Sequence, residues 1–125
     1  MKLRIRGSSL RLRLGRTEVA RVAEGERVED TIAFGATRAE RFVYAFVPSD
    51  EVMEMRARFA ANEVTVMVPT GRAREWATGS DVGLASEQAI GDGTTLAILV
   101  EKDFACLKPR DGEDDSDAYA NPTAT

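Results

Sequence analysis

Apolar and basic side chains alternate at the start of the chain, in the stretch MKLRIRGSSLRLRL. Leucine or isoleucine stands at every second position, and lysine or arginine fills the positions between them. A period of two is typical of a strand with one buried face, because successive side chains point to opposite faces of a sheet. The pattern therefore predicts two strands joined at GSS, with the basic side chains opposite the leucines.

The remaining chain predicts more strands of similar length. They are expected over residues 27–35, 41–48, 63–69, 81–90 and 94–104. Pro48 is expected to close the second of these strands, and GDG at residues 91–93 marks a turn. The last strand, TTLAILVEKDF, is the most apolar and is expected to be central in a sheet.

Two stretches predict short helices. In TEVARVAEG, Thr17 is the expected N-cap and Gly25 the expected stop. In TGRAREWA, Thr70 is the expected cap, and Trp76 is expected to turn towards the core.

Residues 49–59, SDEVMEMRARF, fit both a helix and a strand. Ser49 would cap a helix, whereas apolar residues alternating with Glu54, Arg56 and Arg58 predict a strand. We favour the strand, paired as a hairpin with residues 63–69, because only AAN separates the two stretches.

Together these elements predict a β-rich α+β fold with about seven or eight strands and two short helices. The strands would form a mostly antiparallel curled sheet or a small β-barrel. Residues 1–110 are expected to form a single domain, followed by an acidic and flexible tail at residues 111–125. The sequence shows no internal repeat beyond the tandem arginine strands.

Composition restricts the possible chemistry. The 125 residues include one cysteine and no histidine, which excludes histidine-dependent catalytic triads and leaves too few ligands for a structural zinc site. Any metal would be a hard cation bound by oxygen, and the sequence predicts no cofactor. No apolar run is long enough for a membrane helix, and the opening stretch lacks the pattern of a signal peptide. A cytoplasmic location is expected, and the oligomeric state stays open.

Charge is unevenly distributed around a net value of −4. Residues 1–16 contain six bases and no acid, whereas residues 111–125 contain five acids and no base. One end of the chain would therefore attract an anion, and the other end would compete with it.

The alternation places four arginines on one face of the first hairpin: Arg4, Arg6, Arg11 and Arg13. Guanidinium groups bind phosphate and carboxylate oxygens with two parallel hydrogen bonds, so this face would bind a polyanion or a partner protein. The alternative is a solvated sheet face, cross-paired with acids such as Glu29 and Glu54. Aromatic residues do not interleave with the arginines, so base stacking is not predicted.

A second candidate site depends on barrel closure. The charged residues of several strands would then line a polar cavity that handles phosphates with a divalent metal. These residues are Glu54, Arg56, Arg58, Glu87, Glu101 and Asp103. The alternative is again a solvated face. Cys106 is predicted to be a packed rather than reactive thiol, and the acidic run DGEDDSD does not have the spacing of an EF-hand loop.

Three resemblances widen the set of functions. EKDFACL followed by GEDDSDAYANP, together with the opening stretch, resembles a family of small uncharacterised bacterial proteins containing a domain of unknown function. Residues 1–32 resemble the swapped-hairpin DNA-binding domain of transition-state regulators and antitoxins, which implies a DNA-binding fold completed by two chains. LRIR and MEMRARF are similar to strands of the triphosphate-tunnel enzymes, although EMRAR has only one acid where that signature has two.

The best-supported function is a non-enzymatic binding module that uses the arginine face. The alternatives are a metal-dependent phosphate-handling enzyme in a small barrel and a swapped-hairpin DNA-binding regulator.

Overall fold

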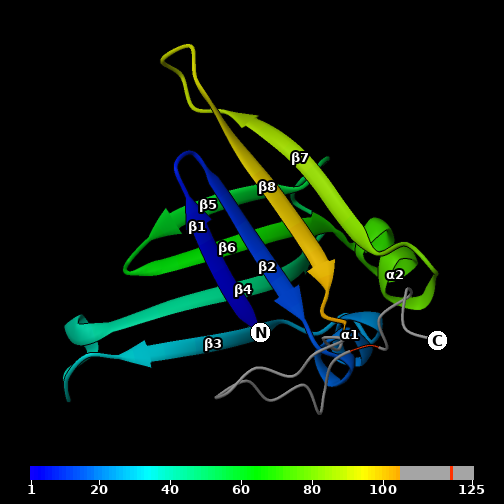
Figure 1. Ribbon diagram of the computed structural model, residues 1–125, viewed down its shortest axis with the longest axis horizontal. Helices are drawn as coiled ribbons and strands as arrows, with labels where there is room; N and C mark the ends of the chain where they lie inside the picture. The colour runs from blue at the N-terminus through cyan, green and yellow to red at the C-terminus, as the bar shows by residue number, and fades with distance from the viewer. Residues whose placement is uncertain (105–118, 120–125) are drawn as a thin grey trace.

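The computed structural model describes residues 1–104 and residue 119, and these form eight strands and two α-helices (Figure 1). The predicted β-rich α+β class is therefore confirmed. In chain order the elements are β1 Lys2–Arg6, β2 Ser9–Leu14, α1 Arg16–Ala23, β3 Val28–Ala33, the 3₁₀ turn η1 Arg38–Glu40, β4 Arg41–Ser49, β5 Arg56–Ala60, β6 Glu63–Pro69, α2 Thr70–Thr78, β7 Gly83–Ala89 and β8 Thr95–Lys102.

The strands form two separate sheets of four. Sheet A has the order β1-β2-β8-β7 and sheet B the order β3-β4-β6-β5. In each sheet the central pair is parallel and the two outer pairs are antiparallel. The mostly antiparallel pairing is thus confirmed, with β8 in a central position. The small-barrel alternative is wrong, because each sheet ends in edge strands and no ladder of the described residues joins one sheet to the other.

The chain contains a structural repeat that the sequence does not reveal. Residues 1–49 form a hairpin, a helix and a second hairpin, and residues 56–102 repeat that order. The two hairpins of each half lie in different sheets, so each sheet contains one hairpin from each half. The parallel pairs β2–β8 and β4–β6 are the lines along which the halves meet. The halves are therefore interlocked within one chain.

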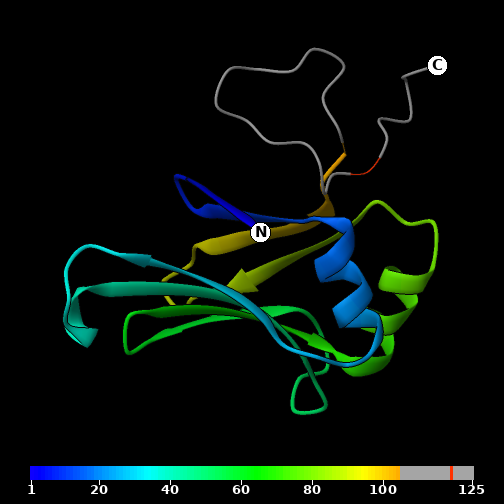
Figure 2. The same ribbon diagram turned by 90° about the horizontal axis from the view of Figure 1, so that it is seen from below.

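The core lies between the sheets and under the helices. Figure 2 shows the sheets as two layers with α1 and α2 beside each other at one end. Trp76 of α2 is fully buried, its ring centroid lies 5.8 Å from that of Phe46, and its Nε1 donates to the Val82 carbonyl at 3.2 Å. The predicted inward orientation of Trp76 is confirmed. Neither α-helix of the described residues has the length and apolar character to cross a membrane.

The structure corrects three predicted boundaries. Helix α1 is capped by Gly15 instead of Thr17, because the Glu18 carboxylate accepts the Gly15 backbone N–H at 3.0 Å. Helix α2 begins at Thr70, with Pro69 in the cap position. Strand β4 continues through Pro48, whose fixed φ suits an extended backbone and which is the penultimate residue of the strand.

The ambiguous stretch before residue 60 forms a strand only from Arg56, and β5 pairs with β6 as the predicted hairpin. Ala61 and Asn62 form its two-residue turn with φ values of 52° and 62°. Both lie in the left-handed region, which matches the twist of a tight hairpin but strains the alanine.

The predictions for Cys106 and for residues 111–125 fall on parts of the chain that the structure does not describe, except for Tyr119. The Tyr119 ring centroid lies 5.5 Å from that of Phe104, just beyond β8.

Candidate anion-binding face

The outer face of sheet A consists of three rows of side chains that run across its four strands. Strand pairing sets each row: Arg6 lies opposite Ser9, Ser9 beside Ala97, and Ala97 opposite Glu87. The same pairing gives a second row of Arg4, Arg11, Leu99 and Ala85, and a third of Lys2, Arg13, Glu101 and Gly83. All four predicted arginines therefore share one face, which we call the arginine face.

Two guanidinium groups on this face have no ionic partner within the part of the chain that the structure describes. Arg4 and Arg6 are exposed, and neither side chain makes an ion pair or hydrogen bond among the described residues. An arginine without a carboxylate keeps its donors available for an incoming anion. These two residues are therefore the strongest candidates for anion contact.

The other two arginines share one carboxylate. Arg11 Nε lies 3.2 Å from Glu101 Oε1, and Arg13 Nε lies 3.8 Å from the same oxygen. This buried oxygen forms no hydrogen bond with the described residues, so both contacts are charge pairs without hydrogen-bond geometry. Arg11 is the nearer countercharge of this buried oxygen, so an anion in contact with Arg11 would share its charge with Glu101.

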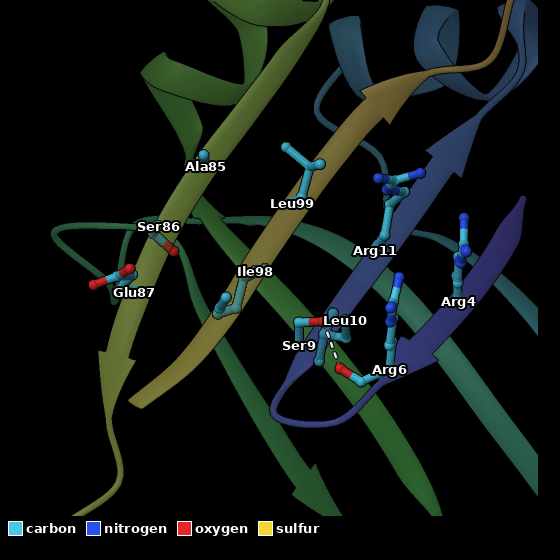
Figure 3. A pocket seen from close by; sticks show the side chains of 11 residues that line it. Arg4, Arg6, Ser9, Leu10, Arg11, Ala85, Ser86, Glu87, Ile98 and Leu99 are labelled. Carbon is cyan, nitrogen blue, oxygen red and sulfur yellow. Dashed lines mark hydrogen bonds between the residues drawn. The ribbon is translucent and has the colours of Figure 1, made fainter. Parts of the chain in front are cut away.

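The first two rows enclose an open trough of about 570 Å³ (Figure 3). In Figure 3 the side chains of Arg4, Arg6 and Arg11 stand on one side of it, and Glu87 lies on the far side. Ala85, Ala97 and Leu99 line the space between these two walls. The volume falls in the range of small-molecule sites. This trough could not be predicted from the sequence, because it exists only once β2 and β8 pair.

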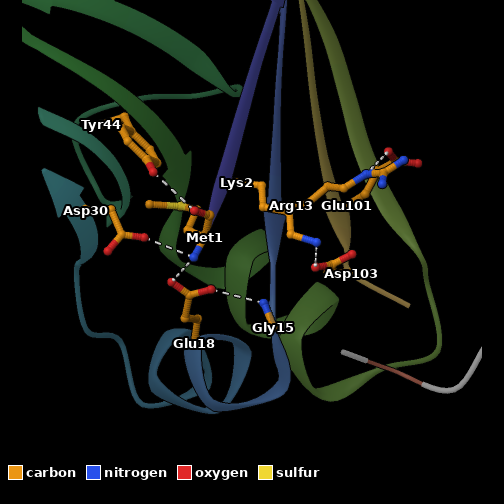
Figure 4. A network of polar contacts seen from close by, with 9 residues as sticks. All are labelled: Met1, Lys2, Arg13, Gly15, Glu18, Asp30, Tyr44, Glu101 and Asp103. Carbon is orange, nitrogen blue, oxygen red and sulfur yellow. Dashed lines mark hydrogen bonds and ion pairs between the residues drawn. The ribbon is translucent and has the colours of Figure 1, made fainter. Parts of the chain in front are cut away.

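The third row is neutralised by neighbouring acids (Figure 4). Lys2 Nζ pairs with the Asp103 carboxylate at 3.0 Å, and Arg13 faces Glu101. Net positive charge is therefore concentrated on Arg4 and Arg6, towards the tip of the hairpin.

The Met1 amine anchors the base of this hairpin to the rest of the protein (Figure 4). The amine nitrogen lies 2.9 Å from Glu18 Oε2 and 3.0 Å from Asp30 Oδ2. The backbone carbonyl of Met1 accepts a hydrogen bond from the Tyr44 hydroxyl at 3.2 Å. Burial opposes the charged amine, but the hydrogen bonds to Glu18 and Asp30 outweigh it and raise its pKa. These contacts tie the hairpin to α1 and sheet B.

The six charges proposed for a polar cavity do not come together. Glu87 and Glu101 lie on the outer face of sheet A, and Asp103 follows β8. Arg56 and Arg58 lie on sheet B, and Glu54 precedes β5. Among residues 1–104 and 119, no three acidic or cysteine side chains gather in a way that would hold a metal ion.

Sheet B has an equivalent face with different chemistry. Counted from the hairpin turns, Arg4 corresponds to Arg58 and Arg6 to Ala60. Ser9 corresponds to Glu63, whose carboxylate pairs with Arg27 at 2.5 Å. The hydrogen bond from Arg27 lowers the pKa of Glu63. Arg56 and Arg58 are exposed and unpaired among the described residues, as Arg4 and Arg6 are, so the two faces differ at the positions of Ala60, Glu63 and Thr65.

The fold and this face define a β-rich protein of two mixed sheets with a basic outer surface. The chain belongs to the family of unknown function DUF7009, which matches residues 1–123. The resemblance to a family containing a domain of unknown function is thereby confirmed. No curated protein and no solved structure matches the chain.

Proposed function

We propose that this protein is a non-enzymatic binding module whose arginine face binds an anionic ligand or an acidic partner protein. The observation that supports it is the presence of two unpaired guanidiniums, Arg4 and Arg6, beside Arg11 at the edge of an open trough. These two groups, together with Arg11, whose charge is shared with Glu101, offer phosphate or carboxylate oxygens several charge-assisted hydrogen bonds. A cytoplasmic setting fits the single cysteine.

The test is retention on heparin and its dependence on salt. Arg4→Glu combined with Arg6→Glu is expected to abolish retention, because it reverses the two uncompensated charges. Arg56→Glu combined with Arg58→Glu is the matched control, since it makes the same change of charge on the equivalent strand of sheet B. Far-UV circular dichroism would verify that both variants fold. Equal loss of retention in the two variants would show a non-specific charge effect and refute the proposal.

A DNA-binding regulator is the second candidate, and the repeat favours it. The swapped-hairpin resemblance implied a fold completed by two chains, and here two halves exchange hairpins within one chain. A two-stranded β-ribbon also fits the major groove of DNA, and β1–β2 presents such a ribbon with a basic outer face. Fluorescence anisotropy with a labelled duplex of mixed sequence tests this. Binding that is lost in the Arg4/Arg6 variant would support it, and no binding at 50 mM salt would rule it out.

The metal-dependent enzyme alternative gains no support from the described residues, which offer it no metal centre.

A further inference from the structure

The trough on the arginine face has two walls of opposite charge. Arg4 and Arg6 stand on β1 and Glu87 on β7, the two edge strands of sheet A, with β2 and β8 between them. Strands lie about 4.8 Å apart, so the backbones of β1 and β7 are separated by roughly 14 Å. The long arginine side chains reduce this span, and the remaining space suits an elongated small molecule rather than a single inorganic ion.

The two walls require different chemical groups at the two ends of a ligand. Unpaired guanidiniums bind a phosphate, whereas the Glu87 carboxylate accepts hydrogen bonds and repels a phosphate. Glu87 is exposed, and its side chain makes no ion pair or hydrogen bond within the described part of the chain. A ligand with an anionic end and a hydrogen-bond-donating end would therefore bind in one orientation.

The floor between the walls is low and apolar. Ala85 and Ala97 are exposed small residues, and Leu99 is half-buried beside them. Ser9 adds little polarity, because its hydroxyl donates to the Arg6 carbonyl at 2.7 Å. Such a floor accommodates a flat apolar surface without leaving polar groups unsatisfied.

We propose that this trough binds a nucleotide, with the phosphate on Arg4 and Arg6, the base over the alanines, and the donor groups of the base or sugar on Glu87. This inference rests on the proposed anion-binding function and names its ligand class. The equivalent face of sheet B cannot bind in the same way, because Ala60 stands in place of Arg6 and Thr31 in place of Glu87. One nucleotide per chain is expected.

Isothermal titration calorimetry with AMP, GMP, CMP and UMP tests the proposal, with pyrophosphate and the free nucleosides as comparison ligands. At least one nucleotide is expected to bind ten times more tightly than pyrophosphate, with a stoichiometry of one. Arg4→Gln combined with Arg6→Gln should weaken nucleotide and pyrophosphate binding tenfold or more. Glu87→Gln should weaken only the nucleotide, by about threefold to tenfold. Arg56→Gln combined with Arg58→Gln is the matched control and should change neither.

The outcomes separate this inference from the broader function. Equal affinity for pyrophosphate and nucleotides, unaffected by Glu87→Gln, would overturn the nucleotide proposal and leave the anion-binding function standing. Binding of duplex DNA but of no mononucleotide would also overturn it, in favour of the DNA-binding alternative. Failure of every anion to bind would refute both.

Discussion

Cutting the chain between its two halves should give fragments that fold only together. The linker between β4 and β5 spans residues 50–55, and Met53 within it is fully exposed. Fragments 1–52 and 53–125 would each contain one complete hairpin–helix–hairpin unit. Alone, each fragment lacks the parallel partner strand of both its hairpins. The pairing that is lost comprises six residue pairs between β2 and β8 and seven between β4 and β6. Each also loses contacts such as that between Phe46 and Trp76.

The cost of the cut follows from converting an intramolecular association into a bimolecular one. A short linker gives an effective concentration of about 1 mM, so at 10 µM of each fragment the complex should be less stable than the intact chain by about 2.7 kcal/mol. The reassembled complex should therefore form at micromolar concentrations. Its melting temperature should rise with fragment concentration, whereas that of the intact chain should not.

Trp76 provides the assay, because it is the only tryptophan and is fully buried. Its emission should shift to shorter wavelength when fragment 1–52 is added to fragment 53–125. A chain with a protease site inserted after Val52 is the control, since it should match the parent before cleavage. Cooperative unfolding of either fragment alone, with native-like Trp76 emission for the second, would refute the interlocked arrangement.

Three further predictions concern stability. The pKa of the Met1 amine is raised on folding, so its contribution to the free energy of unfolding is complete below the ordinary pKa of 8.0 and is lost as pH rises through the higher folded pKa. Asp30→Asn should therefore flatten the decline in thermal stability above pH 8. Burial lowers the pKa of Lys102, which has the opposite effect on stability, but this effect is common to the parent and the variant. Ala61→Gly should stabilise the protein by about 0.5 to 1 kcal/mol in urea unfolding, because the φ of 52° strains alanine, and a loss of stability would contradict the assigned turn. Gln88→Leu should destabilise the protein by about 2 to 3 kcal/mol, because the side-chain amide of Gln88 forms two hydrogen bonds with the β5 backbone, at 2.7 and 2.9 Å. A change below about 0.5 kcal/mol would show that water replaces these two bonds.

Local patterns in the sequence were sufficient to predict most of the elements. The alternation over residues 2–14 was sufficient to place Arg4 with Arg6, and Arg11 with Arg13, on one face of their strand. The two-residue turn between the strands then brings both pairs to the same face of the hairpin. The helix around Trp76 likewise follows from local spacing and capping residues. The boundaries at Thr17 and Pro48 were wrong because they depend on single hydrogen bonds and on pairing, which local residue preferences do not encode.

Strand partners could not be predicted, since many short alternating strands are compatible with one another. The arginine face was predicted as a set of residues, but the trough was not. Glu87 reaches the same row as Arg6 only through β2–β8, a parallel pair whose members lie more than eighty residues apart in the chain. Ala85 and Ala97 carry no chemical signal of their own, so only the register identifies them as a floor. The repeat was missed because corresponding positions in the two halves share the pattern of buried residues but few residue types.

Comparison of the two halves shows which feature sets the arginine face of sheet A apart. Both hairpins have the same frame, with a two-residue turn and a parallel neighbour in the other half. On sheet B, Arg56 and Arg58 are also exposed and unpaired among the described residues, while Glu63 is paired with Arg27. On sheet A, Arg4 and Arg6 stay exposed and unpaired among the described residues, although like charges on one strand repel. The difference is therefore Arg11, which lies opposite Arg4 and adds a third guanidinium to this face, where sheet B has the buried Thr65 opposite Arg58. This grouping of three, rather than unpaired charge alone, supports the proposed binding face.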